Sequence, residues 1–103
     1  MNRQARSRLE RRAAVLKALA HPSRLMLLEE LSRGERCVCD LHDLAGGDFS
    51  TVSKNLAQLR QAGLLEMEKR GLKVFYRLKS RCVLRLLECA DQAVQSAAKE
   101  ARK

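Results

Sequence analysis

Apolar residues recur at helical spacing through the first third of the chain. They follow one another at i, i+4, i+7 and i+11, at Leu9, Ala13, Leu16 and Ala20. This spacing predicts an amphipathic helix that ends near His21, because Pro22 disfavours a helical residue before it. Proline fits the first turn of a new helix, so we expect a second helix up to Ser32, closed by Gly34.

The middle of the chain predicts a short extended segment followed by two helices. Residues 35–39 are too few for a helix, and Asp40 is expected to cap a short helix that ends at the glycine pair 46–47. Ser50 is the predicted N-cap of a further helix that runs to Ala62, before Gly63. Its buried face is expected to hold Val52, Leu56 and Leu59. Two helices joined by a tight turn are typical of a helix-turn-helix.

The apolar spacing changes from about 3.6 to about 2 after Leu64, which predicts two strands. Their alternating apolar positions are Leu65, Met67, Leu72, Val74, Tyr76 and Leu78. The run Lys69, Arg70 and Gly71 is expected to form a hairpin tip, because glycine supplies the positive φ of a tight turn. The expected tip therefore carries two cations.

The last segment, from Arg81 to Ala101, carries a narrow apolar seam. Its members are mostly small and alternate at spacings of four and three: Val83, Leu87, Ala90, Val94, Ala97 and Ala101. The first helix of the same chain is able to cover such a seam, but a narrow seam also suits the pairing of two copies. We favour the pairing. The expected fold is mainly α with a small β-hairpin, dimeric through its first and last helices.

Composition narrows the class of protein. The 103 residues include 46% hydrophobic residues and four cysteines and carry a formal net charge of +9, which suits one globular domain over residues 1–103. No apolar run approaches the roughly 20 residues that cross a bilayer, so we expect a cytoplasmic protein with no membrane partner. In that reducing compartment, cysteines indicate metal binding or redox chemistry more than disulfides.

The charge is unevenly distributed along the chain. Residues 18–49 are acidic overall and residues 50–81 are basic, which suits either a polyanion-facing surface or an ordinary solvated face. The predicted helix from Ser50 favours the first interpretation, because one of its faces is polar and free of acids. That face holds Thr51, Lys54, Asn55 and Gln58.

The polar face suits the major groove of double-stranded DNA. Asn55 and Gln58 are expected to bond base edges, with adenine the natural bidentate partner of an amide. Contacts to phosphates near the helix N-terminus are expected from Ser50, Thr51, Ser53 and Lys54.

The hairpin is expected to contact the DNA backbone or the minor groove. Its contacts are expected from Lys69, Arg70 and Lys73, which add affinity rather than sequence choice. RNA is the weaker option, because Phe49 and Tyr76 are expected to point inward and leave no stacking platform.

Four segments of the chain share the features of a known family. They are ALAHPSRL at 18–25, ERCVCDL at 35–41, STVSKNLAQLRQAGL at 50–64 and YRL at 76–78. Together they resemble the ArsR/SmtB family of bacterial metal-responsive repressors, which are winged-helix dimers. The run from Cys37 to Leu41 looks like the signature of the arsenical-sensing branch. The resemblance implies a winged helix-turn-helix repressor that binds operator DNA as a homodimer.

The cysteines are the candidate sensor. Thiolates select soft or borderline ions, and Cys37 and Cys39 precede a predicted helix N-terminus, whose dipole stabilises thiolates. The extended segment of a winged helix lies beside the second hairpin strand, which is expected to bring the chain just past Lys79 close to Cys37. The resemblance implies that As(III) is bound by three thiolates. The third ligand is expected from one of three residues, in order of preference Cys82, Cys89 and His42.

The sequence thus predicts a repressor that arsenite releases from DNA. Sb(III), Cd(II) and Zn(II) are alternative ligands, and a nitrogen donor from His42 would favour the last two. The same fold also suits a Cd, Zn or Pb sensor, or a thiol-redox or persulfide sensor. A metallochaperone that uses Cys-x-Cys leaves the acid-free helix face unexplained. No catalytic triad, metal-hydrolase spacing or phosphate-binding loop indicates an enzyme.

Overall fold

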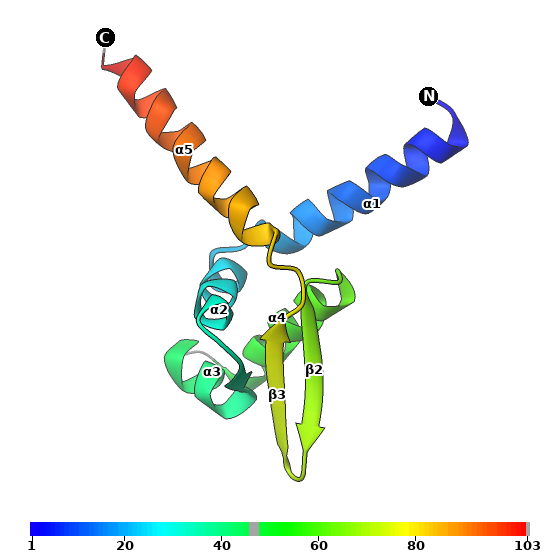
Figure 1. Ribbon diagram of the computed structural model, residues 1–103, viewed down its shortest axis with the longest axis vertical. Coiled ribbons are helices and arrows are strands. Elements are labelled where there is room, and N and C mark those ends of the chain that lie inside the picture. The colour runs from blue at the N-terminus through cyan, green and yellow to red at the C-terminus, as the bar shows by residue number, and fades with distance from the viewer. Residues whose placement is uncertain (46–47, 103) are drawn as a thin grey trace.

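The computed structural model describes residues 1–45 and 48–102. In chain order its elements are α1 (Arg3–Leu19), α2 (Pro22–Ser32), β1 (Arg36–Cys37), α3 (Val38–Ala45), α4 (Phe49–Gln61), β2 (Leu65–Arg70), β3 (Lys73–Leu78) and α5 (Val83–Ala101). Helices therefore dominate, and a small antiparallel sheet is formed by β1, which precedes α3, and by β2 and β3, which follow α4 (Figure 1). This order confirms the predicted mainly α, winged helix-turn-helix fold. No helix in the described residues is both long enough and apolar enough to cross a membrane.

The core lies between α2, α3 and α4. Its largest fully buried side chains are all leucines: Leu27, Leu28, Leu31, Leu41, Leu56 and Leu59. Leu65 of β2 and Tyr76 of β3 are buried in the same cluster, so the sheet packs against the helices rather than standing apart. Full burial of a leucine stabilises a fold by about 1.5–3 kcal/mol, so this cluster fixes how α4 is presented to solvent.

The sheet has the order β1-β3-β2, and both neighbouring pairs are antiparallel. The extended segment before α3 does lie beside the second hairpin strand, as predicted. The predicted tip is displaced, however, because Arg70 still pairs with Lys73 and the connection is Gly71 and Leu72. Gly71 has a φ of 62°, which matches the first position of a type II′ turn. Lys69 and Arg70 therefore belong to the end of β2.

Two predicted helix starts are wrong, by three residues for α3 and by two residues for α4. α3 begins at Val38, so Asp40 lies within its first turn, where a carboxylate still opposes the helix dipole favourably. Asp48 occupies the N-cap position of α4, and the Ser50 hydroxyl donates a hydrogen bond to its carboxylate. Asp48 and Ser50 are both residue types that favour the N-cap position, so residue spacing alone does not show which of them occupies it. The expected α3 terminator, the pair 46–47, lies outside the described residues.

The first and last helices diverge from the core like the arms of a V (Figure 1). The radius of gyration is 16.1 Å, against about 13 Å for a compact domain of about 100 residues. Leu16 on α1 is 53% exposed and Val94 on α5 is 70% exposed. The α5 seam is thus left uncovered by α1 of the same chain, which removes the alternative in which a lone domain covers it.

Candidate nucleic-acid interface and cysteine site

α4 presents a polar face away from the core. Val52, Leu56 and Leu59 bury its opposite side, so the two faces separate as the sequence predicts. Thr51 and Lys54 are exposed, whereas Asn55 and Gln58 are half-buried. Ser53 is also half-buried and faces a groove towards the sheet. The helix contains no acidic residue, which makes its exposed face suitable for a polyanion.

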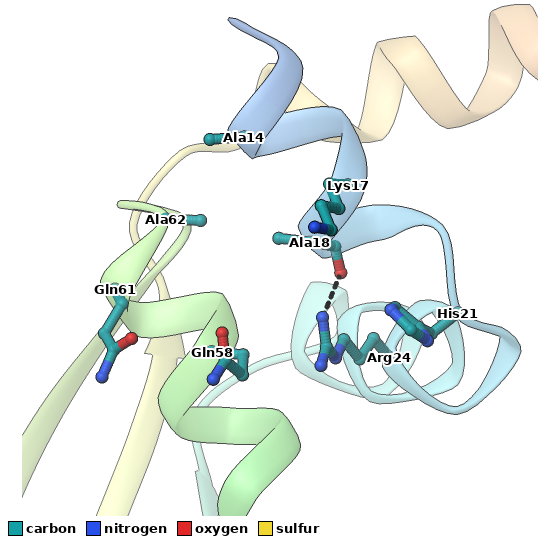
Figure 2. Close-up of a pocket in the computed structure, with 8 residues that line it drawn as sticks. All are labelled: Ala14, Lys17, Ala18, His21, Arg24, Gln58, Gln61 and Ala62. Atoms are coloured by element: carbon teal, nitrogen blue, oxygen red, sulfur yellow. Dashed lines mark hydrogen bonds between the residues drawn. The ribbon is translucent and has the colours of Figure 1, made fainter. Parts of the chain in front are cut away.

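A cationic pocket of about 440 Å³ adjoins this face, where α1, α2 and α4 meet. Figure 2 shows the Lys17, His21 and Arg24 side chains on one side and Gln58 and Gln61 on the other. No acidic side chain is among the residues that line it. The pocket therefore extends the basic, donor-rich surface of α4 towards the end of α1.

Arg24 connects three helices inside this region. Its Nη1 donates to the Ala18 carbonyl oxygen at 3.2 Å, and its Nε donates to Asn55 Oδ1 at 3.1 Å. No role for Arg24 was expected from the spacing of residues along the chain. One signal was present, because a cation in the first turn of a helix opposes the helix dipole and so indicates a partner elsewhere.

The wing, which is the β2–β3 hairpin, carries an ion-pair network. Arg70 donates to both Glu35 oxygens, at 2.6 and 3.0 Å, and to Glu68 at 2.6 Å, and its guanidinium lies 4.6 Å from the Phe75 ring centroid. These hydrogen bonds and the positive charge of Arg70 lower the pKa of the Glu68 carboxyl. Arg77 adds a 2.7 Å ion pair with Glu66. Arg70, which is expected to contact DNA, is thus paired with the carboxylates of Glu35 and Glu68 in this structure.

Lys69 and Lys73 are the exposed lysines of the wing. They occupy neighbouring strands, one at the end of β2 and one at the start of β3. Phe49 is 52% exposed, which corrects the expectation that it points inward, whereas Tyr76 is buried as expected. An exposed Phe49 follows from its position as the first residue of α4, ahead of the first buried turn.

Cys37 and Cys39 lie together beside the wing. Cys37 ends β1 and is 6% exposed, and Cys39 is exposed in the first turn of α3. A hydrogen bond with the Cys37 side chain, and then the charge of that thiol, raises the pKa of Cys39. Both cysteines line a groove of about 330 Å³ that also contacts Phe49 and Leu72. The pair therefore combines two soft donors with an apolar surface.

Cys82 and Cys89 are not part of this pair within one chain. The expectation that the chain past Lys79 lies near Cys37 is wrong, because Cys37 pairs with Phe75 and the strands are antiparallel. Because β1 and β3 run in opposite directions, residues farther along β3 lie opposite residues that precede Cys37 in the chain. The chain beyond β3 therefore reaches the end of α2. There, Arg81 Nη2 lies 3.4 Å from the Ser32 carbonyl oxygen.

The remaining sulfur and nitrogen donors stand apart. Cys82 is exposed at the start of α5, 3.1 Å from Ser80 Oγ, and Cys89 is exposed farther along α5. His42 packs against Phe49, with ring centroids 5.3 Å apart. Within residues 1–45 and 48–102, no three His, Cys, Asp or Glu side chains gather closely enough to hold a metal ion.

Comparisons with known proteins agree with this geometry. A family model described as bacterial regulatory protein, arsR family, matches residues 21–67. A biofilm growth-associated repressor of Agrobacterium fabrum is 40% identical over 76 residues, which are 74% of this chain and 65% of the relative. The chain spans about a third to two thirds of the length of the first curated relatives, which are named as transcriptional regulators or repressors rather than enzymes.

Solved structures give the same picture. The solution structure of a homodimeric winged helix-turn-helix DNA-binding domain from Mycobacterium bovis, a possible ArsR-family regulator, has a TM-score of 0.82 and 30% identity, covering 97% of this chain and 93% of that one. An antimony-specific transcriptional repressor, AntR, has a TM-score of 0.70 and 34% identity, covering 84% and 79%.

Proposed function

Because this chain belongs to the arsR family of bacterial regulatory proteins, we propose that it is a transcriptional repressor controlled by a thiophilic ion. It binds operator DNA as a homodimer, and arsenite bound at Cys37 and Cys39 releases it. The observation that carries the proposal is the acid-free, polar outer face of α4, held by a fully buried leucine face behind it.

DNA binding rests on the separation of charge over the surface. α4 enters the major groove with Thr51, Lys54, Asn55 and Gln58 towards the duplex. Lys17 and Arg24 in the adjoining pocket attract backbone phosphates, and Lys69 and Lys73 of the wing add contacts of the same kind. Each neutralised phosphate releases counterions, so affinity falls steeply with salt.

A second copy of this chain completes the DNA-binding unit. α1 and α5 carry apolar side chains that this protomer leaves exposed, among them Leu16, Leu86 and Val94. The similar protein from Mycobacterium bovis is homodimeric. Pairing through these helices covers the seam of α5 and places two α4 helices on half-sites roughly one helical turn, about 34–36 Å, apart.

The ligand is a soft ion that thiolates prefer. Cys37 and Cys39 supply two sulfur donors that line the same groove, and As(III) takes three. We assign the third donor to Cys82 or Cys89 of a second copy, because both lie exposed on or at the start of α5. His42 is the remaining candidate. Sb(III) has the same donor preference, and the similar AntR protein is antimony-specific.

Release follows from the position of the cysteine pair. Cys37 ends β1, which pairs with β3 of the wing, and Cys39 lies in the first turn of α3, which packs on α4. An ion that draws this pair towards α5 of the other protomer changes the angle between the two DNA-reading arms. DNA and the ion then weaken each other's binding by the same coupling free energy.

The test is a titration of the DNA complex under full reductant. A labelled duplex bound by the reduced protein is titrated with arsenite, and release is followed by fluorescence anisotropy. Cys37→Ser with Cys39→Ser should bind DNA as tightly as the wild type and lose the release. Unchanged release in the double variant would remove the cysteine pair as the sensor. Equal affinity for palindromic and scrambled duplexes would remove sequence-specific repression.

The presence of two free cysteines, Cys37 and Cys39, in one groove also favours a second candidate, a thiol-redox or persulfide sensor of the same fold. The same titration separates the two. An ion sensor responds to arsenite in the presence of excess reductant, whereas a redox sensor responds only to an oxidant or a persulfide donor.

A further inference from the structure

We propose that Arg24 determines which base Asn55 reads: by bonding Asn55 Oδ1, it makes Asn55 a donor that selects guanine rather than adenine. The inference rests on the proposed DNA binding through α4. It replaces the expectation that Asn55 pairs with adenine in a bidentate manner.

The hydrogen bond fixes the orientation of the Asn55 amide. Arg24 Nε has only a proton to offer, so the Asn55 atom 3.1 Å away must be the oxygen rather than the nitrogen. The guanidinium is held from the other side as well, because its Nη1 donates to the Ala18 carbonyl oxygen (Figure 2). Arg24 and Asn55 are both half-buried, so the Asn55 amide has little room to rotate. Rotation would also break this hydrogen bond between α2 and α4.

The Asn55 nitrogen remains available to DNA. No partner for Nδ2 occurs among the hydrogen bonds of the described residues, in which every buried side-chain nitrogen or oxygen has a partner. Nδ2 therefore reaches solvent on the polar face of α4. Asn55 presents an N–H donor outward, with its acceptor turned towards Arg24.

A donor beside a cation selects an acceptor-rich base edge. Adenine offers one acceptor and one donor in the major groove. Its N6 amino group would have to use the second lone pair of an oxygen that already accepts from Arg24, beside a positive charge that repels the amino hydrogens. Guanine offers two acceptors, O6 and N7, and both the Asn55 donor and the Arg24 charge attract them. Thymine has a single acceptor and cytosine presents a donor, so we expect guanine first.

The experiment begins with selection by the full-length wild type from a pool of randomised duplexes. The position that Asn55 contacts is identified as the one whose base preference disappears in Asn55→Ala. Duplexes with each of the four bases at that position are then compared by anisotropy at fixed salt. The wild type should prefer guanine over adenine by roughly tenfold, a typical value for one side-chain contact.

Variants of Arg24 test the cause. Arg24→Ala frees Asn55 Oδ1 and should move the preference towards adenine, and Arg24→Met, which also has no N–H donor, should do the same with less disturbance of packing. Lys17→Ala is the matched control, because Lys17 lines the same pocket without a bond to Asn55. It should weaken binding to all four duplexes equally. Thermal unfolding of each variant confirms that it is folded.

Two results would overturn the inference while the proposed function stands. One is that the wild type prefers adenine at the position that Asn55 contacts. This result requires no Arg24 variant. The other is an unchanged preference in both folded Arg24 variants. If the wild type selects no sequence at all, the proposed repressor function fails and the inference fails with it.

Discussion

Arg70 at the end of β2 is bonded to Glu35, the residue just before β1, with Nη1 2.6 Å from Oε1. Glu35 stands two residues before Cys37. The contact between Arg70 and Glu35 therefore links the wing to β1, the strand that carries the proposed sensor residue Cys37. The same contact keeps the Arg70 guanidinium away from the DNA. An ion at Cys37 that moves β1 also moves the anchor of Arg70.

We predict that Glu35→Gln strengthens DNA binding at low salt. Removal of this carboxylate leaves Arg70 bonded to Glu68 alone, so the Arg70 charge is held less and is freer to contact a phosphate. The dependence of log affinity on log salt should therefore steepen, by at most about 1. Anisotropy titrations at several salt concentrations measure this slope. Glu10→Gln, an equal charge change on exposed α1, is the control and should leave the slope nearer that of the wild type. If Glu35→Gln and Glu10→Gln show the same dependence of log affinity on log salt, the proposed role of Glu35 is contradicted.

The pKa of Glu68 provides a pH test of the same network. Hydrogen bonding and charge from Arg70 lower this pKa, so the carboxylate is stabilised in the folded state. The stabilisation is fully present above the unfolded pKa of glutamate and is lost as the pH falls through the lowered folded pKa. Arg70→Gln should raise the pKa of Glu68 towards its ordinary value. Carboxyl NMR titration measures it, and an unchanged midpoint would show that Arg70 does not hold Glu68 in solution.

The dimer prediction concerns Val94, which is 70% exposed on α5. Val94→Glu places a charge in the proposed seam of both copies and should raise the dimer dissociation constant roughly tenfold or more, since a buried valine contributes about 1.5–3 kcal/mol. Sedimentation analysis measures the change. Leu72→Glu is the matched control, because Leu72 is fully exposed on the wing and outside the seam. Equal dimerisation of Val94→Glu and the wild type would place the interface elsewhere.

The parts of the fold that depend on local periodicity could be predicted from the sequence. α4 separates Val52, Leu56 and Leu59 from its polar face because a 3.6-residue period leaves one solution for burial. The hairpin follows for the same reason. Strand register does not follow from local pattern, so the hairpin tip moved to Gly71 and Leu72, and the expected approach of Cys82 to Cys37 failed.

The candidate site also has a part that the sequence predicts and a part that it does not. The polar face of α4 belongs to one helix, so the spacing of residues along the chain predicts it. The Arg24 bond to Asn55 joins residues 31 positions apart, and the Arg70 bond to Glu35 joins residues 35 apart. Such contacts depend on how helices and strands pack, which neither periodicity nor capping rules encode. The structure is needed to show that Arg70 is paired with Glu35 and that the Asn55 oxygen accepts a hydrogen bond from Arg24.

The last prediction concerns the ionisation of Cys39. Its pKa is raised first by the hydrogen bond with Cys37, next by the electrostatic interaction with Cys37, and then by desolvation and the negative charges of Asp40 and Asp43. A thiol releases its proton when it binds Cd(II), so the affinity for Cd(II) should rise as the pH increases towards the raised pKa. Arsenite, As(OH)3, carries each thiol proton away as water, so its affinity should show no such rise. Cys37→Ala removes the first two causes and should lower the pKa of Cys39, as measured by the pH dependence of the Cys39 Cβ chemical shift in a parent protein that lacks Cys82 and Cys89 and still holds Cys37. Asp43→Asn removes the smallest of the causes and should lower this pKa less. A Cys39 pKa that does not respond to Cys37→Ala would mean that the two thiols are apart in solution, and the proposed two-sulfur core of the sensor would then have to form only when the ion arrives.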